Sequence, residues 1–340
     1  MTSPFRAPDA DSLRDAAKLL KEGRLVVFPT ETVYGLGANA MDPAAVERIF
    51  AAKGRPNDNP VIVHVASQLA AQKLVQEWPP LAERFAKAFW PGPLTLVLPR
   101  AAGVPDAVTG GLDSVAIRVP AHPVAQQLLR ACGLPLAAPS ANTSGRPSPT
   151  TAQHAQSDLG DKVPLYLDAG PTEHGLESTV VSLLGPNPVL LRQGAIPREA
   201  LERFVKVWDK PGAPGGPTLS PGTKYRHYAP SAKVRLLASQ DVATEWRKNG
   251  GDPRKAFIVS AESAAAGMMG RNVAVPGPRG DAEAWAHELF ALLRRFDRKD
   301  EILVEAIPEK GLGAAVMERL RKAAEPPSPA GPQGTQGPKG

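Results

Sequence analysis

The sequence predicts an α/β protein with a large mixed sheet, followed by a smaller parallel α/β domain. First, residues 11–206 alternate helical and strand-like periodicity, as expected of a sheet covered by helices. Second, strand-like segments within 94–119 and within 178–191 follow one another without a helix, so the sheet should be mixed rather than purely parallel. Third, the proline- and glycine-rich stretch 210–221 separates this region from a second alternation of strands and helices.

Within the first domain, helices are predicted from apolar residues at helical spacing and from capping residues at their starts. Asp42 and Pro43 give the clearest start, a side-chain cap followed by a proline in the first turn. The helices are expected at 11–22, 43–52, 67–76, 80–89, 122–131 and 197–206. The strands are expected at 24–28, 61–65, 94–98, 115–119, 135–138, 165–168, 178–183 and 188–191. These elements form a domain that we expect over residues 1–209.

A linker or lid is expected at 210–231, because KPGAPGGPTLSP cannot hold a regular element. A small α/β domain should follow at 232–324, with a helix at 281–296 that places Trp285 and Leu289 on one apolar face. Its strands are expected at 234–237, 256–260, 273–275 and 302–305. The remaining residues, 325–340, contain nothing that could build a core and are expected to be disordered.

Composition excludes several classes of protein. With 340 residues and ordinary apolar content, the chain is long enough for two domains. It has no apolar run long enough to cross a membrane, and acidic residues near the N-terminus argue against a signal peptide, so we expect a cytoplasmic protein. The net charge of +6 lies mostly after residue 210, where weak contact with RNA is one interpretation and a solvated surface the other. Cys132 is alone and is expected to be buried filler.

The stretch PTETVYGLGANA, at residues 29–40, has the glycine spacing of a dinucleotide-binding loop. However, six residues separate the preceding strand from the first glycine, and the next helix begins beyond the glycines. The following strand at 61–65 also carries no acidic partner for a ribose. We therefore do not expect NAD. The polar insert at 30–34 is interpreted as a ligand-facing loop at the carboxyl end of a strand, with a plain surface turn as the alternative.

Common catalytic devices are absent from the sequence: it has no P-loop, no zinc-ligand pattern and no nucleophile elbow. Instead, cationic and hydroxyl residues gather in turns. KGRPNDNP, at a helix end, holds Lys53 and Arg55 in a tight turn that suits an anion, although cations there also complement the helix dipole. Arg118 lies inside an apolar strand, where a charge is costly unless it is paired or faces a ligand, so it is a candidate for binding a carboxylate or phosphate.

Three more polar stretches complete this set. PSANTSGRPS, at 139–148, offers hydroxyls, an amide and the Arg146 guanidinium, which suit phosphate oxygens and a base edge. Glu177-Ser178-Thr179 begins one strand, and Arg192 ends the next. SPGTKYRHYAP, at 220–230, could stack on a base and close over phosphates, or merely dock the second domain. Anion contacts without a protein nucleophile indicate phosphate-group chemistry in which the reactants supply the nucleophile.

These blocks resemble the threonylcarbamoyl-AMP synthase family in its long form, which has a YrdC-like domain and a C-terminal extension. PTETVYGLG, KGRPNDNP with VIVHV, FWPGPLTLVL, PSANTSG, ESTVV, LRQGAI and SPGTKYRHYAP stand in the family's order over about residues 10–310. The resemblance implies a YrdC-like twisted mixed sheet and a Rossmann-like C-terminal domain. It also implies a nucleotidyltransferase that makes L-threonylcarbamoyl-AMP and pyrophosphate from L-threonine, bicarbonate and ATP, for N6-threonylcarbamoyladenosine modification of tRNA.

The same resemblance implies roles for individual residues. Lys53, near the phosphates, and Arg55 would be the catalytic cations. The residues expected to hold threonine are Thr32, His64, Arg118, Ala138 through its backbone, and Ser178. Those expected to hold ATP are Arg55, Asn59, Ser114, Ser140, Ser148, Arg192 and Tyr228. We expect no metal ion bound by the chain itself, since Mg²⁺ would arrive on ATP.

The expected partners are the three substrates, a downstream threonylcarbamoyl transferase complex and, weakly, tRNA, with no membrane. Two other functions stay open at this point. One is an RNA-binding module without catalysis. The other is carbamoyl transfer to a protein by a related domain, although the chain lacks the zinc-finger and acylphosphatase-like segments that this would require.

Overall fold

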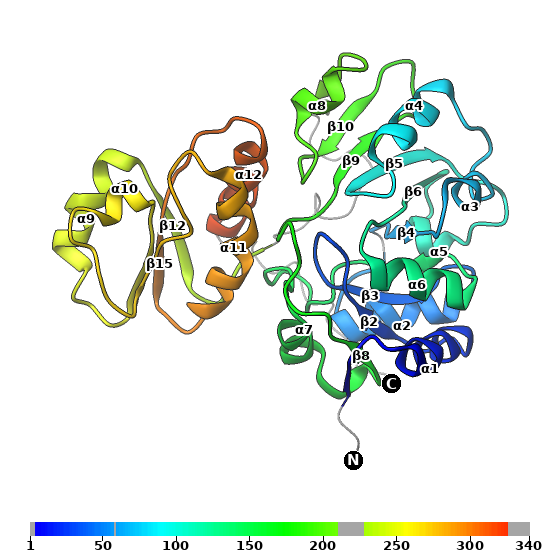
Figure 1. The fold of residues 1–340 in the computed structure, drawn as a ribbon, viewed down its shortest axis with the longest axis horizontal. Helices are drawn as coiled ribbons and strands as arrows, with labels where there is room; N and C mark the ends of the chain where they lie inside the picture. The colour runs from blue at the N-terminus through cyan, green and yellow to red at the C-terminus, as the bar shows by residue number, and fades with distance from the viewer. Residues whose placement is uncertain (1–3, 58, 210–227, 326–340) are drawn as a thin grey trace, which may run out of the picture.

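The computed structural model describes residues 4–57, 59–209 and 228–325. They form two sheets in two bodies that lie side by side, with helices α11 and α12 on the side of the smaller body that faces the larger (Figure 1). The predicted linker up to residue 227 and the predicted tail from residue 326 lie outside the described residues. Within the described part, no helix is long and apolar enough to cross a membrane.

The larger sheet has eleven strands in the order β1-β8-β2-β3-β7-β4-β6-β5-β9-β10-β11. Its neighbours are parallel in some pairs, such as β4 with β6, and antiparallel in others, such as β5 with β6. This confirms the predicted mixed sheet. The strands are β1 (Phe5–Arg6), β2 (Val26–Phe28), β3 (Gly35–Asn39), β4 (Ile62–His64), β5 (Leu94–Pro99), β6 (Ser114–Arg118), β7 (Leu136–Ala137), β8 (Tyr166–Leu167), β9 (Thr179–Ser182), β10 (Val189–Arg192) and β11 (Trp208–Asp209).

Eight α-helices accompany this sheet in the described residues, and most begin where the capping residues predict. Asp9 accepts a hydrogen bond from the Ser12 amide at the start of α1, and Asp42 caps α2 in the same way. Gly54 then ends α2 in a left-handed conformation with φ of 58°. The helices are α1 (Ala10–Lys21), α2 (Pro43–Lys53), α3 (Gln68–Gln72), α4 (Pro80–Phe89), α5 (Asp106–Thr109), α6 (Pro123–Cys132), α7 (Ala152–Leu159) and α8 (Arg198–Glu202).

Several local predictions were wrong. Helix α3 is shorter than the predicted 67–76, because Val75 pairs with Arg100 in a β-bridge instead of continuing the helix. Helix α7 was not predicted, since its buried face consists of only two alanines and a leucine, a weak periodic signal. The short elements β1, β11 and α5 were also missed, and α8 ends before the predicted residue 206.

Strand β3 corrects the interpretation of the glycine-rich stretch. Residues Gly35–Asn39 form a strand antiparallel to β2 rather than continuing the loop. Gly37 lies against the ring of Phe28, and a Cβ atom there would come within 2.8 Å of the ring. Lack of space beside an aromatic neighbour therefore explains this glycine, without any need for a pyrophosphate.

The smaller sheet has four parallel strands in the order β12-β15-β13-β14, which confirms the predicted parallel α/β unit. Helix α11 begins at the Asp281 cap and buries Trp285 and Leu289, as predicted. The strands are β12 (Lys233–Leu237), β13 (Lys255–Ile258), β14 (Val273–Ala274) and β15 (Glu301–Glu305). The helices are α9 (Val242–Asn249), α10 (Ala261–Ala264), α11 (Ala282–Arg295) and α12 (Leu312–Ala324).

The two bodies share a packed boundary. Val33 and Leu176, from loops of the larger body, belong to the hydrophobic core of the smaller one. Gly175 has a φ of +68°, and a Cβ atom there would lie 2.5 Å from two carbonyl oxygens of α11. The backbones therefore approach more closely than any side chain at this position would allow.

Candidate functional site

The polar stretches gather beside the larger sheet around a cavity of about 710 Å³, a volume that includes open solvent at its mouth. Strands β4, β6 and β10 end and β9 begins at one edge of this sheet, whereas β2 and β7 run antiparallel to β4 and end toward the opposite edge. The cavity is lined by the ends of β4, β6 and β10, the start of β9 and the loops that follow β2 and β7, and also by Tyr228, the first described residue after the linker. Open α/β sheets hold ligands beyond the carboxyl ends of their strands, as at β4 and β6 here.

Arg118, at the end of β6, is paired and also lines the cavity. Its guanidinium lies 2.6 Å from the Glu31 carboxylate, and each side chain is only 3% exposed. It also donates to Thr32 Oγ1 at 2.8 Å and to the Gly92 carbonyl at 3.1 Å. Burial alone would raise the pKa of Glu31, but the charge of Arg118 and the hydrogen bonds to the carboxylate together outweigh burial, so the pKa is lowered. We call Glu31, Thr32, His64 and Arg118 the Arg118 cluster.

His64 stands beside Arg118, since the two residues are in register on neighbouring parallel strands. Burial, with the charge of Arg118 in addition, lowers the pKa of His64 to about 3. The imidazole is therefore neutral at ordinary pH. Its Nδ1 atom is buried and has no hydrogen-bond partner among the described residues. A ligand in the cavity would therefore meet both a neutral ring and a cation of this cluster.

Lys53 links the end of α2 to the loop after β7. Its buried ammonium donates to the carbonyls of Ser140 and Asn142, each at 2.5 Å. Burial, reinforced by the charge of Arg55, holds the pKa of the Lys53 amine well below its usual value. Dipole compensation at the helix end does not account for these contacts, because the ammonium leaves the helix to bind the loop. Arg55 donates to the carbonyls of Asn59 and Pro60 at 3.1 and 3.0 Å.

The loop 138–148 carries the PSANTSGRPS stretch and is held from within. Ser140 Oγ donates to Asn142 Oδ1 at 2.5 Å, and Nδ2 of the Asn142 side chain donates to the Arg146 carbonyl at 2.9 Å. The backbone of Tyr34 fixes the loop from the other side, because its carbonyl accepts from the Ala141 amide at 2.8 Å. Such internal bonds make a rigid frame for a ligand rather than a loose surface turn.

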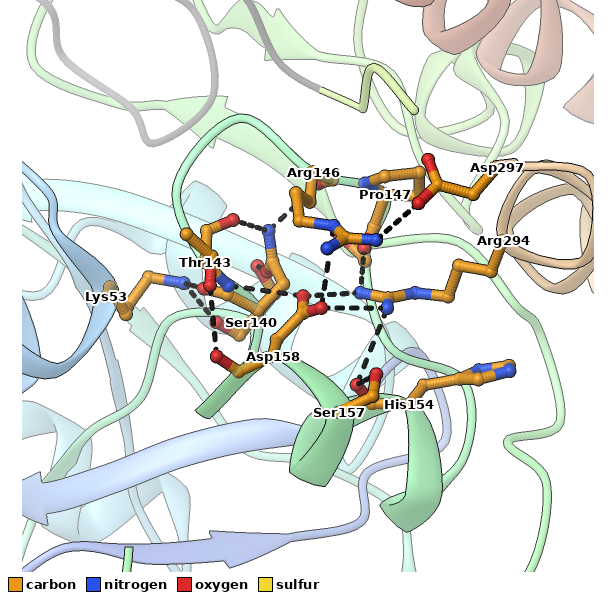
Figure 2. A network of polar contacts seen from close by, with 12 residues as sticks. Lys53, Ser140, Thr143, Arg146, Pro147, His154, Ser157, Asp158, Arg294 and Asp297 are labelled. Atoms are coloured by element: carbon orange, nitrogen blue, oxygen red, sulfur yellow. Dashed lines mark hydrogen bonds and ion pairs between the residues drawn. The ribbon is translucent and has the colours of Figure 1, made fainter. Parts of the chain in front are cut away.

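The outer side of this loop is fastened to the smaller body, as Figure 2 shows. Asp158, from α7, accepts from the Thr143 amide at 3.2 Å and from Arg294 of α11 at 2.8 Å. Arg294 also donates to the Pro147 carbonyl at 2.5 Å. Asp297 accepts from Arg146 at 2.7 Å. We call Arg146, Asp158, Arg294 and Asp297 the α11 latch.

A second buried group lies where the two bodies meet at the cavity. Ser148 Oγ donates to Glu177 at 2.5 Å, and Arg319 of α12 donates to the other oxygen of the same carboxylate at 3.1 Å. The Arg319 guanidinium stands 5.2 Å from the centre of the Tyr228 ring, which stacks on Phe290 at 5.4 Å. We call Ser148, Glu177, Tyr228 and Arg319 the interdomain cluster. Beside it, Arg192 donates to the Ser178 carbonyl at 2.9 Å and to the Ser178 hydroxyl at 3.0 Å.

The structure brings most of the predicted site residues to the cavity. Those that line it are Thr32, Lys53, Arg55, His64, Arg118, Ala138, Ser140, Ser148, Ser178, Arg192 and Tyr228. Asn59 and Ser114 are buried but are not part of the lining. Ser114 begins β6, whereas Arg118 ends it, so the strand directs these two residues to opposite edges of the sheet.

Sequence reasoning named Glu31 and Glu177 only within their stretches and overlooked Arg319. An acid in a loop that also carries cavity residues was a usable signal for Glu31 and Glu177. Arg319 offered no such signal, because its partner lies 142 residues away in the sequence. No group of three or more possible metal ligands occurs among residues 4–57, 59–209 and 228–325.

Comparison with known proteins identifies both parts of the chain. Residues 18–194 match the family described as Telomere recombination, and residues 196–325 match the Threonylcarbamoyl-AMP synthase, C-terminal domain family. The threonylcarbamoyl-AMP synthases of Pyrococcus abyssi and Bacillus subtilis are 46% and 43% identical to the chain. The alignments cover 92% of this chain in both cases, and 93% and 92% of the two relatives.

A solved structure agrees with these sequence matches. The crystal structure of Sua5 from P. abyssi in complex with L-threonine matches with a TM-score of 0.87 at 45% identity. The match covers 94% of this chain and 96% of that one. The YrdC-like sheet and the enzyme class implied by the sequence blocks are therefore confirmed. The chain belongs to the threonylcarbamoyl-AMP synthase family.

Proposed function

We propose that the chain carries out its family's reaction in the cavity that the polar stretches line beside the larger sheet. That reaction is the synthesis of L-threonylcarbamoyl-AMP and pyrophosphate from L-threonine, bicarbonate and ATP. The observation that carries this assignment is the convergence of Lys53, Arg55, Arg118 and Arg192 on one cavity that is lined by hydroxyls and contains no lining cysteine. Such a lining suits anionic reactants that bring their own nucleophile.

Threonine belongs beside Arg118 in this proposal. At most three of the five N–H groups of Arg118 are used by Glu31, Thr32 and Gly92, so others are left for a carboxylate. Thr32, neutral His64, the backbone of Ala138 and the Ser178 hydroxyl would hold the rest of the amino acid. The P. abyssi structure, which contains L-threonine and is 45% identical to the chain, supports threonine as a ligand of this chain.

ATP belongs on the other side of the lining. Arg55, Ser140, Ser148, Arg192 and Tyr228 would hold the nucleotide, with Lys53 near the phosphates. Asn59 and Ser114 do not reach the cavity and would act only indirectly. Asn59 is the better placed of the two, because its backbone carbonyl accepts a hydrogen bond from Arg55. Mg²⁺ would enter with the ATP phosphates as part of the substrate. The linker at 210–231, together with Tyr228, would close as a lid over the nucleotide.

The chemistry then needs position and charge from the protein more than reactive groups. The threonine amine and bicarbonate give a carbamate, whose oxygen attacks the α-phosphorus of ATP while pyrophosphate leaves. Cations that the protein fixes in position lower the activation barrier of this step by neutralising the charge that develops on the phosphate oxygens. Lys53 and Arg55 are the candidates for this role. Exclusion of water would protect the mixed anhydride until a downstream threonylcarbamoyl transferase complex uses it on tRNA in the cytoplasm.

Pyrophosphate release is the direct test. We expect release from ATP only when threonine and bicarbonate are both present, with L-threonylcarbamoyl-AMP as the second product by mass spectrometry. The Arg55 and Arg192 variants should lose this activity, whereas a variant of the exposed Arg14 should keep it. Absence of release by the unaltered chain with all three substrates present would contradict the proposal. RNA affinity that survives loss of Arg55 and Arg192, without turnover, would instead favour a binding module.

A further inference from the structure

Helix α12 carries an arginine in a place where solvated charges are rare. Arg319 is 0% exposed and lies on the helix face that buries Val316, Leu320 and Ala323. Removing a guanidinium from water costs several kcal/mol unless partners compensate for the loss. A residue of this kind at the boundary with the catalytic cavity needs a reason beyond helix packing.

Three neighbours of Arg319 belong to the cavity wall, and a fourth partner, Glu318 of the same helix, accepts from its Nη1 at 3.3 Å. Nε donates to Glu177 at 3.1 Å, and Glu177 in turn accepts from Ser148, while the guanidinium faces the Tyr228 ring. Glu177, Ser148 and Tyr228 all line the cavity, but Arg319 does not. Arg319 therefore stands directly behind the lining and can act on a ligand only through these neighbours.

The charge of Glu177 explains what Arg319 could do there. Burial would raise the pKa of Glu177, but the charges of Arg319 and Arg192, together with the hydrogen bonds to the carboxylate, outweigh burial and lower the pKa, so that the carboxylate is ionised. A carboxylate on the wall of a cavity for a triphosphate repels its ligand unless a cation neutralises it. At short range in a partly dry site, this repulsion is strong.

We propose that Arg319 is a positioning residue for the ATP subsite, supplied by the C-terminal domain. It neutralises Glu177, fixes the carboxylate that orients Ser148 and supports the face of Tyr228. This inference rests on the proposed placement of ATP. It assigns to α12 a role in nucleotide affinity, beyond closing the site, and predicts that threonine affinity depends on Arg319 much less.

The test compares four full-length variants: Arg319→Met, Arg319→Lys, Glu177→Gln and the double variant Arg319→Met with Glu177→Gln. Pyrophosphate release is measured while ATP and threonine are varied separately, and equilibrium ATP binding is measured without turnover. Arg321→Met is the matched control, because Arg321 lies on the same helix, is half exposed and pairs with Glu309 outside the cavity. Thermal unfolding reports the folded fraction of each variant.

We expect Arg319→Met to raise the KM and the Kd for ATP about tenfold, as one uncompensated charge near a triphosphate would, with the threonine KM changed less than twofold. Arg319→Lys should recover part of this loss. Glu177→Gln in the Arg319→Met background should bring ATP affinity back towards that of the unaltered chain, because the repelling charge is gone and the amide oxygen still accepts from Ser148. Arg321→Met should change nothing.

Three results would overturn the inference. One is an equal rise in both KM values, and another is a lower unfolding temperature with unchanged ATP affinity, since each indicates a purely structural pair. The third is a double variant no better than Arg319→Met. If Arg319→Met does not fold, the ATP affinity of Arg319→Lys and Glu177→Gln decides, and unchanged affinity in both overturns the inference. Absence of turnover by the unaltered chain would contradict the proposed function. Comparison of ATP binding by the unaltered chain and by the variants would still test the role of Arg319.

Discussion

Two buried arginine–glutamate pairs stand at the same cavity, and they are built differently. Arg118 and Glu31 come from one domain and lie 2.6 Å apart. Arg319 and Glu177 come from two domains and lie 3.1 Å apart. The first pair is complete as soon as the larger sheet has folded. The second exists only when the C-terminal domain is docked, so one half of the cavity is preorganised and the other half is conditional on docking.

The surroundings of the pairs extend this contrast. The Arg118 cluster is tied to its own domain through Thr32 and the Gly92 carbonyl. The interdomain cluster and the α11 latch instead join the cavity loop to α11 and α12 through Glu177, Asp158 and Arg146. In the proposed function, threonine would meet a finished subsite, whereas the ATP subsite would need both domains. The predictions below separate these two halves.

Deletion of residues 211–340 should have the largest effect. It removes Arg319 and Tyr228 and exposes Val33 and Leu176, so we expect synthesis to fall by at least about 10²-fold, because the ATP subsite loses its positioning groups. The first domain should stay folded by circular dichroism, with its Arg118 cluster intact. Threonine binding by calorimetry should therefore survive. Unchanged turnover in the truncated chain would show that the ATP subsite does not depend on the C-terminal domain.

Arg118→Met should damage the other half. We expect the threonine KM to rise about 10²-fold and the free energy of unfolding to fall by about 3–5 kcal/mol, because Glu31 is left buried without its partner. Adding Glu31→Gln should restore much of the stability but not the threonine affinity. Steady-state kinetics and denaturant unfolding measure the two effects separately. A double variant that regains threonine binding would show that Arg118 does not contact the substrate.

His64 makes the stability of the Arg118 cluster sensitive to pH. Its folded pKa of about 3 lies below the ordinary value of 6.5. Between these values the unfolded chain takes up a proton that the folded chain refuses, so stability falls as the pH drops. In His64→Gln this contribution is absent. The stability difference between the original chain and the variant should therefore shift against the original by about 2 kcal/mol from pH 7 to pH 5, at about 1.4 kcal/mol per unit below pH 6.5.

Denaturant unfolding at several pH values checks this shift. A His64→Gln variant with the same pH dependence as the original chain would mean that the folded protein does not lower the pKa of His64, which would contradict the prediction.

Arg294→Met, in the α11 latch, should have the smallest effect. It removes the bonds to Asp158 and Pro147 but leaves the lining residues in place, so we expect the ATP KM to rise about fivefold, by about 1 kcal/mol. The threonine KM should stay within twofold. Arg295→Met is the neighbouring control, since Arg295 is exposed and its contacts, with the Arg271 carbonyl and the Phe296 ring, lie within the smaller body. A larger effect on threonine than on ATP would contradict the division of the cavity into two halves.

Local sequence was sufficient for much of the architecture and for part of the site. Asp42, Pro43 and Gly54 define α2 by capping and backbone conformation, which depend on neighbouring residues only. The same locality placed Lys53 at the helix end and Arg118 in an apolar strand, where a charge must find a partner or a ligand. The resemblance of the motifs supplied the family and the reaction.

Tertiary structure alone decided the partners and several placements. Strand β3 forms because Gly37 leaves room for Phe28, and Ser114 turns away from the cavity because β6 carries it to the opposite edge of the sheet. Glu177 and Arg319 are 142 residues apart in the sequence, and neither periodicity nor a motif predicts that they pair. The physical reason is that caps and strands depend on adjacent residues, whereas a buried charge depends on whichever residue the packed domains bring beside it.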